Sequence, residues 1–199
     1  MKKVKSKFLI SLILILGIAS SSFASELQKT LQKEFTVSNN SVFVLMNKHG
    51  KVDVQNWDQN KVAIEVVITV EHPDKEKATK LLEYLNVEFS ESGNELKAIT
   101  TIDQRFSKLI GSGGDRKKYS INYTVQMPKS LDIRLANKYG DTYIDELTGH
   151  ASIDIKYGNL QAHKILRDDT KPLSTLILGY GKATIDEVNW FKIDTKYSG

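Results

Sequence analysis

Histidine and carboxylate side chains are the groups in this chain that could bind a metal ion or exchange protons during catalysis. The sequence has four His and no Cys, which excludes a zinc site built on Cys, and no HExxH motif pairs two of the His. Repeated segments in the C-terminal half place His163 in an outward column between Asp145 and Asp186. An Asp, a His and an Asp on adjacent strands have the donor types to bind a metal ion or polarise a water molecule.

The neighbouring column of the same repeats favours a structural interpretation. It holds Glu146, Lys164 and Glu187, whose charges alternate from strand to strand. Opposite charges on adjacent strands attract by at most about 1 kcal/mol for each pair. Such pairing accounts for both columns, whereas catalysis accounts for only the first. We therefore expect surface pairs here and predict no catalytic, metal-binding or cofactor-binding residue.

Two other segments contain residues that resemble a ligand site. Residues 103–118 have a Gly-Ser-Gly-Gly centre at 111–114, but a P-loop needs Gly-Lys-Ser/Thr and then a helix, and here a strand is expected to follow. Asp168 and Asp169 are adjacent, yet the Gly-Gly-x-Gly-x-Asp repeat that binds calcium is absent. We expect residues 103–118 and 167–172 to be solvated surface loops.

Charge is distributed unevenly along the chain. Residues 1–24 contain four of the 28 Lys and Arg residues and no acid, so the rest of the chain has 24 bases and 24 acids. A chain so close to neutral offers no basic surface to nucleic acid or to an anionic membrane. With 40% hydrophobic and 26% charged residues, its composition is that of a globular protein with one sizeable core.

The first 24 residues have the three parts of a secretory signal peptide. A cationic start precedes an apolar run at 8–18, and Ser22-Phe23-Ala24 is a small-residue cleavage site before Ser25. The apolar run is shorter than the roughly 20 residues that span a bilayer. We therefore predict an exported protein, periplasmic, cell-surface or secreted, with no transmembrane segment in the mature chain.

Strand periodicity dominates from residue 35 onward. Apolar residues alternate with polar ones over 62–70 and 121–125, which predicts half-buried strands. Residues 73–85 break the alternation, because a Pro and acids start the segment and apolar residues recur at helical spacing. We predict one short helix there. Residues 25–34 have two Leu four apart, which suggests a frayed helical turn or a disordered lead.

A repeat organises the C-terminal half. Tyr139, Tyr157, Tyr180 and Tyr197 are 18, 23 and 17 residues apart, and the middle step contains the inserted loop at 167–172. Aligning the copies on the tyrosine gives apolar columns, which should face inward. These columns are Leu135, Ile153, Leu176 and Ile193; Ile144, Ala162 and Ile185; and Leu147, Ile165 and Val188. A distant further copy lies near the N-terminus, at Leu45, Asn47, His49, Gly50, Val52, Val54 and Trp57.

Stacking of these units predicts an all-β fold of the β-solenoid or β-helix type, with turns about 4.8 Å apart. The tyrosines should form an aromatic ladder, packed in the core because alternation puts them on the same face as Ile155 and Leu178; an exposed ladder could instead stack on carbohydrate. Gly140, Gly158 and Gly181 should give the corners their conformational freedom. The competing interpretation is two independent sheets with coincidental Tyr-Gly turns.

The predicted organisation is a signal peptide at 1–24 and one elongated β domain at 25–199. Within the domain, residues 35–130 form a longer-stranded N-terminal region that carries the helix, and residues 131–199 form the repeats. The chain stops at a repeat corner, where the next strand should begin. We therefore expect the native protein to continue beyond Gly199, or a partner chain to cover this edge.

Several segments resemble the bacterial putative-adhesin family of unknown function. They are Asn47-Lys48-His49-Gly50, the strand end at 123–128 and Asn137-Lys138-Tyr139-Gly140-Asp141. The resemblance covers roughly residues 35–199, and it implies an exported protein with an incomplete right-handed β-helix. The family has no catalytic motif to carry over, and its motifs are structural.

Two functions remain open at this point. The first is an exported, non-enzymatic, adhesin-like binding or structural protein of the bacterial cell envelope, whose partner is an envelope protein or a glycan. The alternative is a carbohydrate-active enzyme, a polysaccharide lyase or hydrolase, on a β-helix scaffold.

Overall fold

The described residues form two sheets of seven strands each and two short helices, so the prediction of an all-β protein is confirmed. The computed structural model describes residues 25–38, 40–110, 119–167 and 172–198. The predicted signal peptide, the Gly-Ser-Gly-Gly centre at 111–114, and Asp168 and Asp169 lie outside these residues.

Sheet A combines antiparallel and parallel pairing. In spatial order its strands are β1 (Ser25–Thr36), β4 (Lys61–His72), β7 (Tyr119–Met127), β3 (Val52–Asn56), β9 (Thr142–Leu147), β11 (Leu160–Leu166) and β13 (Ala183–Asn189). The strand β4 is antiparallel to both β1 and β7. Every pairing from β7 to β13 is parallel.

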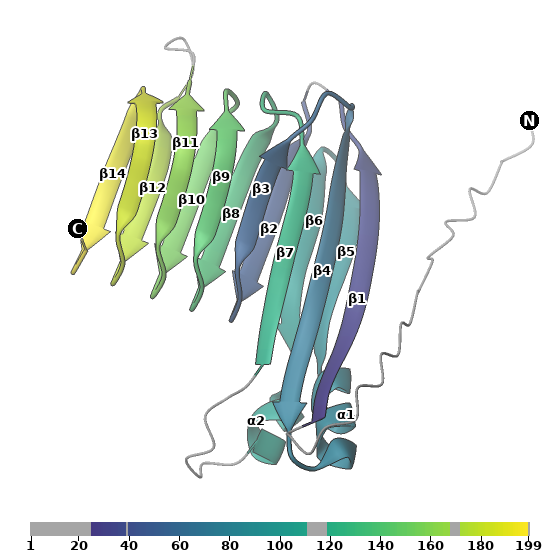
Figure 1. Ribbon diagram of the computed structural model, residues 1–199. Helices are drawn as coiled ribbons and strands as arrows, with labels where there is room; N and C mark the ends of the chain where they lie inside the picture. The colour runs from purple at the N-terminus through teal and green to yellow at the C-terminus, as the bar shows by residue number, and fades with distance from the viewer. Residues whose placement is uncertain (1–24, 39, 111–118, 168–171, 199) are drawn as a thin grey trace, which may run out of the picture.

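Sheet B faces sheet A across the core (Figure 1). In spatial order its strands are β14 (Phe191–Lys196), β12 (Ser174–Gly179), β10 (Ala151–Lys156), β8 (Asp132–Lys138), β2 (Val42–Lys48), β6 (Glu95–Ile102) and β5 (Leu85–Ser92). Only the β5–β6 pair is antiparallel. The other pairs are parallel.

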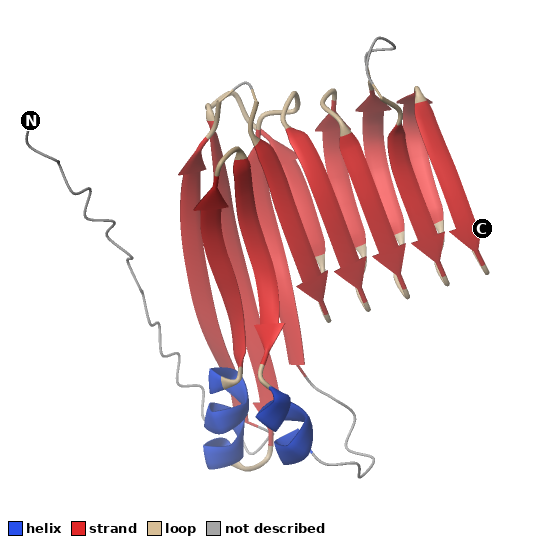
Figure 2. Cartoon of the chain, turned by 180° about the vertical axis from the view of Figure 1, so that it is seen from behind, coloured by secondary structure: helices blue, strands red, loops and turns tan. Residues whose placement is uncertain are grey.

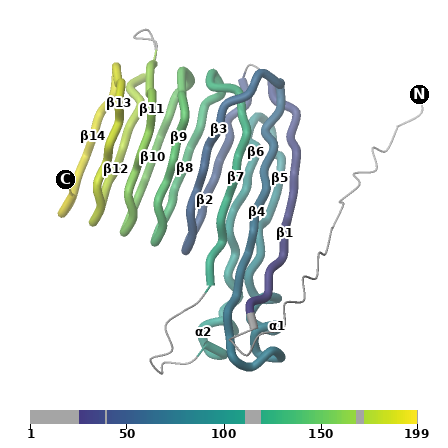
Figure 3. Tube along the Cα trace, viewed as in Figure 1, coloured from purple at the N-terminus to yellow at the C-terminus, as the bar shows by residue number. Residues whose placement is uncertain are grey.

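From β8 to β14 successive strands alternate between the two sheets, as the trace in Figure 3 shows. We call one sheet B strand and the sheet A strand that follows it a rung. The rung of β2 and β3 lies directly on the rung of β8 and β9, where Leu45 is beside Leu135 and Asn47 is beside Asn137. A segment remote in sequence thus occupies the same register as the repeats, because its apolar alternation matches theirs.

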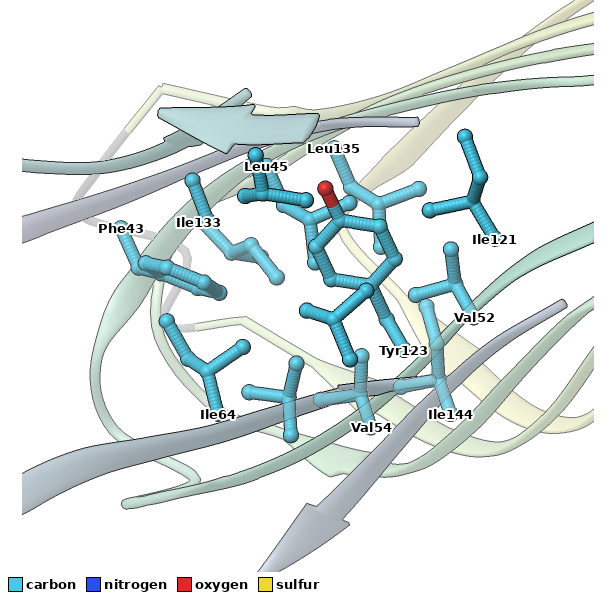
Figure 4. Close-up of a cluster of buried hydrophobic side chains, with 14 of the residues drawn as sticks. Phe43, Leu45, Val52, Val54, Ile64, Ile121, Tyr123, Ile133, Leu135 and Ile144 are labelled. Carbon is cyan, nitrogen blue, oxygen red and sulfur yellow. The ribbon is translucent and has the colours of Figure 1, made fainter. Parts of the chain in front are cut away.

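The core lies between the sheets, and it is filled by the inward half of each strand's alternation. Figure 4 shows Phe43, Leu45 and Leu135 from sheet B facing Val54 and Tyr123 from sheet A. The Tyr123 hydroxyl is 2.8 Å from the Thr100 hydroxyl, and burial raises the pKa of this phenol far above its usual range. The buried polar group therefore keeps a hydrogen-bond partner.

Two helices lie at one end of the long N-terminal strands (Figure 2). The first, α1 (Lys75–Glu83), starts after Asp74, whose carboxylate accepts hydrogen bonds from the backbone N–H groups of Glu76 and Lys77. The helix is therefore shorter than the predicted 73–85, and Leu85 already begins β5. The second, α2 (Gln104–Ile110), lies in the segment predicted to be a loop, and Phe106 is buried. Seven residues with one buried side chain are too few to show a helical period.

The expectation of a helical turn or disordered lead at 25–34 is wrong, because β1 is a twelve-residue strand paired along β4. Leu27 and Leu31 are four apart and therefore also fit a strand period of two. Lys29 and Lys33 occupy the same face of the strand as these leucines, so apolar and polar residues do not alternate in the sequence. Burial lowers the pKa of Lys29, while the charge of Glu83 acts in the opposite direction.

Most residues of the predicted inward columns are buried, and the exposed members of the columns all lie on two strands. Leu135, Ile153 and Leu176 are at most 2% exposed, but Ile193 in the same column is 50% exposed. In the other columns, Val188 is 42% exposed and Ile185 is half-buried. The exceptions all belong to the terminal strands β13 and β14, because no further described rung covers them.

Candidate ligand-binding face

The outer face of sheet A carries two rows of polar side chains, because every second residue of its strands points to solvent. The parallel register sets Asp53 of β3 beside Tyr143 of β9, and Tyr143 beside Gln161 of β11. The second row follows two residues later along the strands, with Gln55, Asp145, His163 and Asp186. Sheet geometry thus brings together residues that are up to about 130 positions apart.

An open groove of ≈ 220 Å³ runs between these rows. Its polar lining is Asp53, Gln55, Tyr143, Asp145, Gln161 and His163, and Val54 and Ile144 complete the lining. We call it the sheet A groove. Carboxylates accept hydrogen bonds, glutamine and histidine both donate and accept, and the tyrosine adds an apolar ring. This set suits a neutral polyhydroxyl ligand better than an anionic one, because the groove holds two carboxylates and no Lys or Arg.

The structure brings together two of the three predicted surface candidates in direct contact. The Nδ1 atom of His163 is 2.8 Å from an Asp186 carboxylate oxygen, and the two side chains are 64% and 63% exposed. Asp145 joins His163 in the lining of the sheet A groove. Among the described residues, no group of three His, Asp or Glu side chains is arranged to hold a metal ion.

The other predicted column forms ion pairs on the same face. Lys164 stands between Glu146 and Glu187 in the register, and its Nζ atom is 2.8 Å from a Glu187 oxygen. That hydrogen bond, together with the charges of Glu187 and Glu146, raises the pKa of Lys164. Glu146 also lies 3.3 Å from Lys129. Charge complementarity between neighbouring strands is therefore present beside the groove.

Sequence reasoning did not identify Asp53, Gln55, Tyr143 and Gln161 as site residues. The repeat pattern contains this information, since Val52 and Val54 occupy inward positions of the same template as Ile144. Asp53 and Gln55 alternate with these inward residues and therefore point outward. Aligning the two copies places Asp53 beside Tyr143.

The predicted ladder residues lie at one corner of the rungs. Rings of His49, Tyr139, Tyr157, Tyr180 and Tyr197 follow one another with centroids 4.8, 5.1, 4.7 and 5.1 Å apart and interplanar angles of at most 19°. At the first end, Tyr119 tilts against His49, and Phe106 of α2 packs edge-on against Tyr119. The Lys138 ammonium lies 4.8 Å from the Tyr139 ring centre.

The expectation that these tyrosines pack in the core is wrong. The first three are 41–48% exposed and Tyr197 is 73% exposed. Each has a positive φ, between 53° and 62°, which turns the side chain out of the alternation that Ile155 and Leu178 follow. The inner rings present edges to solvent, because neighbouring rings cover both of their faces. They therefore offer no free face on which a sugar could stack.

The role expected for the corner glycines also needs correction. The positive φ belongs to the tyrosines, and Gly140, Gly158 and Gly181 do not have it. A Cβ on Gly140 would overlap the carbonyl oxygen of Gly50, one on Gly158 that of Gly140, and one on Gly181 that of Gly158. Glycine is required here because the backbones of adjacent rungs approach too closely for a side chain.

The remaining histidines and the inserted loop are separate from the groove. His72 accepts from the backbone N–H of Asp74, and the Nε2 atom of His150 lies 3.1 Å from the Leu173 carbonyl. Arg167 was expected in a solvated loop, but it is buried, and its Nε donates to the Pro172 carbonyl at 2.6 Å. This hydrogen bond links the two described residues on either side of positions 168–171.

No family model and no curated protein matches this chain. It is similar to the solved structure of a putative cell adhesion protein from Clostridium sporogenes, with 10% identity and a TM-score of 0.46 over 79% of this chain and 72% of that chain. A putative adhesin from Bacteroides fragilis is similar with 11% identity and a TM-score of 0.31, over 85% of this chain and 95% of that chain. A putative lipid binding protein from Parabacteroides distasonis is similar with 12% identity and a TM-score of 0.33, over 83% of this chain and 60% of that chain. These distant likenesses assign neither a ligand nor a partner to this chain.

Neither described helix has the length and apolar character needed to cross a bilayer.

Proposed function

We propose that this is an exported, non-enzymatic binding protein of the bacterial cell envelope, which holds a glycan in the sheet A groove. The groove carries the proposal, because Tyr143, Gln161 and His163 give it an aromatic ring and several hydrogen-bonding groups on one exposed face. Hydroxyl-rich chains are bound by such groups, and an open groove accommodates an extended chain. Export is supported by the signal-peptide pattern of residues 1–24.

We further infer that residues 25–199 form one elongated domain of the β-solenoid type. The continuous sheets support a single domain, since the rung of β2 and β3 stands between the N-terminal strands and the repeats. Parallel pairing, one register for all rungs and stacked corner rings support the solenoid. Residues 35–130 would then form its N-terminal region and residues 131–199 its repeats, as in the family that the sequence resembles.

Binding of the purified protein to a panel of envelope polysaccharides tests the function. We expect Tyr143→Ala and Gln161→Ala to weaken binding of the recognised glycan by about tenfold or more. Ile177→Ala is the matched control, since Ile177 is similarly exposed on the outer face of sheet B, and it should bind as wild type does. Wild-type affinity in Tyr143→Ala would refute the site.

The alternative, a carbohydrate-active enzyme, uses the same face and differs in outcome. Chromatography of the glycan after incubation should show an unchanged chain length if the protein only binds. If the wild-type protein shortens the glycan, and His163→Ala still binds the glycan but no longer shortens it, the protein is an enzyme and the non-enzymatic proposal is overturned.

A further inference from the structure

Three lysines lie side by side at the ends of inner sheet B strands, next to the tyrosine corner. The parallel register sets Lys48 of β2 beside Lys138 of β8, and Lys138 beside Lys156 of β10. The residue before each lysine is buried, so all three lysines point to the outer face. Neighbouring strands are about 4.8 Å apart, and three positive charges therefore follow one another along the stack. We call these residues the lysine row.

The lysine row differs from the charged residues of sheet A. There, Lys164 stands between Glu146 and Glu187, so the neighbours carry unlike charges. In the lysine row the neighbours carry like charges, which repel each other and destabilise a sheet. Anionic groups of a ligand would remove this repulsion, because each group would attract the two ammonium groups on either side of it.

Most of the charge in the lysine row is not neutralised within the chain. Lys48 is exposed and Lys138 is half-buried, and among the described residues neither forms a salt bridge. The Lys138 ammonium lies 4.8 Å from the Tyr139 ring centre and 5.7 Å from that of Tyr157. Such contacts hold a cation in place and do not cancel its charge.

Two carboxylates close to the row in sequence have partners of their own. An Asp154 oxygen is 3.1 Å from the Lys156 ammonium. Asp141, which follows the corner, accepts hydrogen bonds from the backbone N–H and the side-chain amide of Asn159. One paired aspartate against three lysines leaves the row with an excess of positive charge.

The chemistry of the corner suits an anionic chain that also carries hydroxyl groups. Lysine is a point charge on a flexible stem without the planar fork of arginine, so the row recognises a series of charges more than the shape of one group. The exposed tyrosines beside it add phenolic hydroxyls, which donate to and accept from the hydroxyls of a sugar. Single-stranded nucleic acid would need free ring faces for its bases, but neighbouring rings cover both faces of Tyr139 and Tyr157.

We propose that the lysine row binds an acidic polysaccharide, whose chain lies along the stack with carboxylates between adjacent lysines. The row departs from the expectation that a near-neutral chain has no basic surface, because the balance of charges over a whole chain does not show where lysines gather. The sheet A groove lies on the other sheet and holds no Lys or Arg, so this site does not rest on the glycan proposed there.

Polygalacturonate, a linear polymer with a carboxylate on each sugar, is the probe, and its fully methyl-esterified form is the neutral control ligand. We expect calorimetric titration to show binding of the acid form that weakens as salt is added, and no binding of the ester. Lys48→Gln/Lys138→Gln should weaken binding about tenfold or more. Lys75→Gln/Lys192→Gln is the matched control, because it removes two exposed lysines of α1 and β14, and it should bind as wild type does.

Charge reversal separates binding from stability. Lys138→Glu would place unlike charges beside Lys48 and Lys156, so its melting temperature should be equal to or above that of the wild type, while binding of polygalacturonate should be lost. Tyr143→Ala changes the sheet A groove and should leave this binding unchanged. Failure of the groove proposal is thus distinguishable from failure of the lysine row.

Several results would overturn the proposal. They are no binding of polygalacturonate, equal binding of the acid and the ester, and wild-type affinity in Lys138→Glu or in the double lysine variant of the row. Tighter binding of a single-stranded DNA oligonucleotide, or of vesicles that contain anionic lipid, than of polygalacturonate would assign the row to a different class of ligand and would also overturn it.

Discussion

The two ends of the stack are built differently. At the N-terminal end the strands are long, β4 is antiparallel to both of its neighbours, and two helices lie beyond the strand ends. Tyr119 packs against His49, the first ring of the ladder, and Phe106 packs against Tyr119. At the other end β13 and β14 have the same register as the inner rungs and expose the side chains that those rungs bury.

This difference separates two sources of stability. Inner rungs have neighbours on both sides, whereas a terminal rung has a neighbour on one side and gains about half of the contacts between rungs. At the N-terminal end, the long antiparallel strands and the two helices pack beside the last rung. Among the described residues, β13 and β14 have no such elements beside them, and the following substitutions would test how much stability each arrangement provides.

The largest effect is expected at the corner glycines. Gly158→Ala would place a Cβ against the Gly140 carbonyl oxygen, so two rungs must separate, and we expect a loss of about 4 kcal/mol in the free energy of unfolding. In the matched control Gly179→Ala, the new Cβ meets only Lys156 Cγ, at 3.7 Å, and we expect a change within about 0.5 kcal/mol. Urea denaturation measures both. Equal effects would show that close approach is not the reason for glycine.

A second test compares inner and terminal positions of one column. Leu135→Ala should cost about 3 kcal/mol, since it opens a cavity between covered rungs. Ile193→Ala, measured in dilute solution, should cost less than about 1 kcal/mol because half of the side chain is exposed. A cost for Ile193→Ala near that of Leu135→Ala would mean that the end is covered.

A smaller effect is expected from the ladder corners. Tyr157 has a φ of 56°, so a residue with a Cβ is strained there and glycine is not. Both Tyr157→Ala and Tyr157→Gly remove the stacked ring, and the Gly variant should be more stable by about 1 kcal/mol. Thermal or urea unfolding of the pair gives the difference directly. A more stable Ala variant would indicate that the corner relaxes when the ring is absent.

The smallest effect concerns pH at the covered end of the ladder. Burial, together with the nearby Tyr139, raises the pKa of Tyr119 to about 12 from 10.0. The neutral phenol is thus favoured in the folded state, so its contribution to stability is complete below pH 10 and is lost as the pH rises toward 12. Melting temperatures should fall less steeply over that interval in Tyr119→Phe. If the melting temperature of Tyr119→Phe falls as steeply with pH as that of the wild type, ionisation of Tyr119 is not the cause of the loss of stability at alkaline pH.

The periodicity of apolar residues predicted those strands and helices that bury one face along their own length. The alternation at 62–70 lies within β4, and the segment starting at Pro73 contains α1, because burial on one face leaves a period in the sequence. The strand β1 was missed because Lys29 and Lys33 occupy its inner parity. The helix α2 was missed because one buried Phe carries no period.

The candidate site was less predictable because it depends on contacts between rungs. Asp145, His163 and Asp186 came from alignment of the repeats, and His163 and Asp186 are in contact. Tyr143 and Gln161 carry no pattern of their own, and they become neighbours only once the register is known. Exposure of the tyrosines depended on a positive φ, which alternation alone does not reveal.

Because every rung has the same register, the molecule can become longer or shorter by one complete rung at a time. Deletion of residues 141–158 would join Gly140 to Asn159, and it would bring Leu160 to the place that Thr142 now occupies beside Val52. Leu176 would then follow Leu135 in its column. Gain or loss of such a segment by gene duplication or excision lengthens or shortens the reach of the protein by about 4.8 Å and leaves each surviving junction as it was.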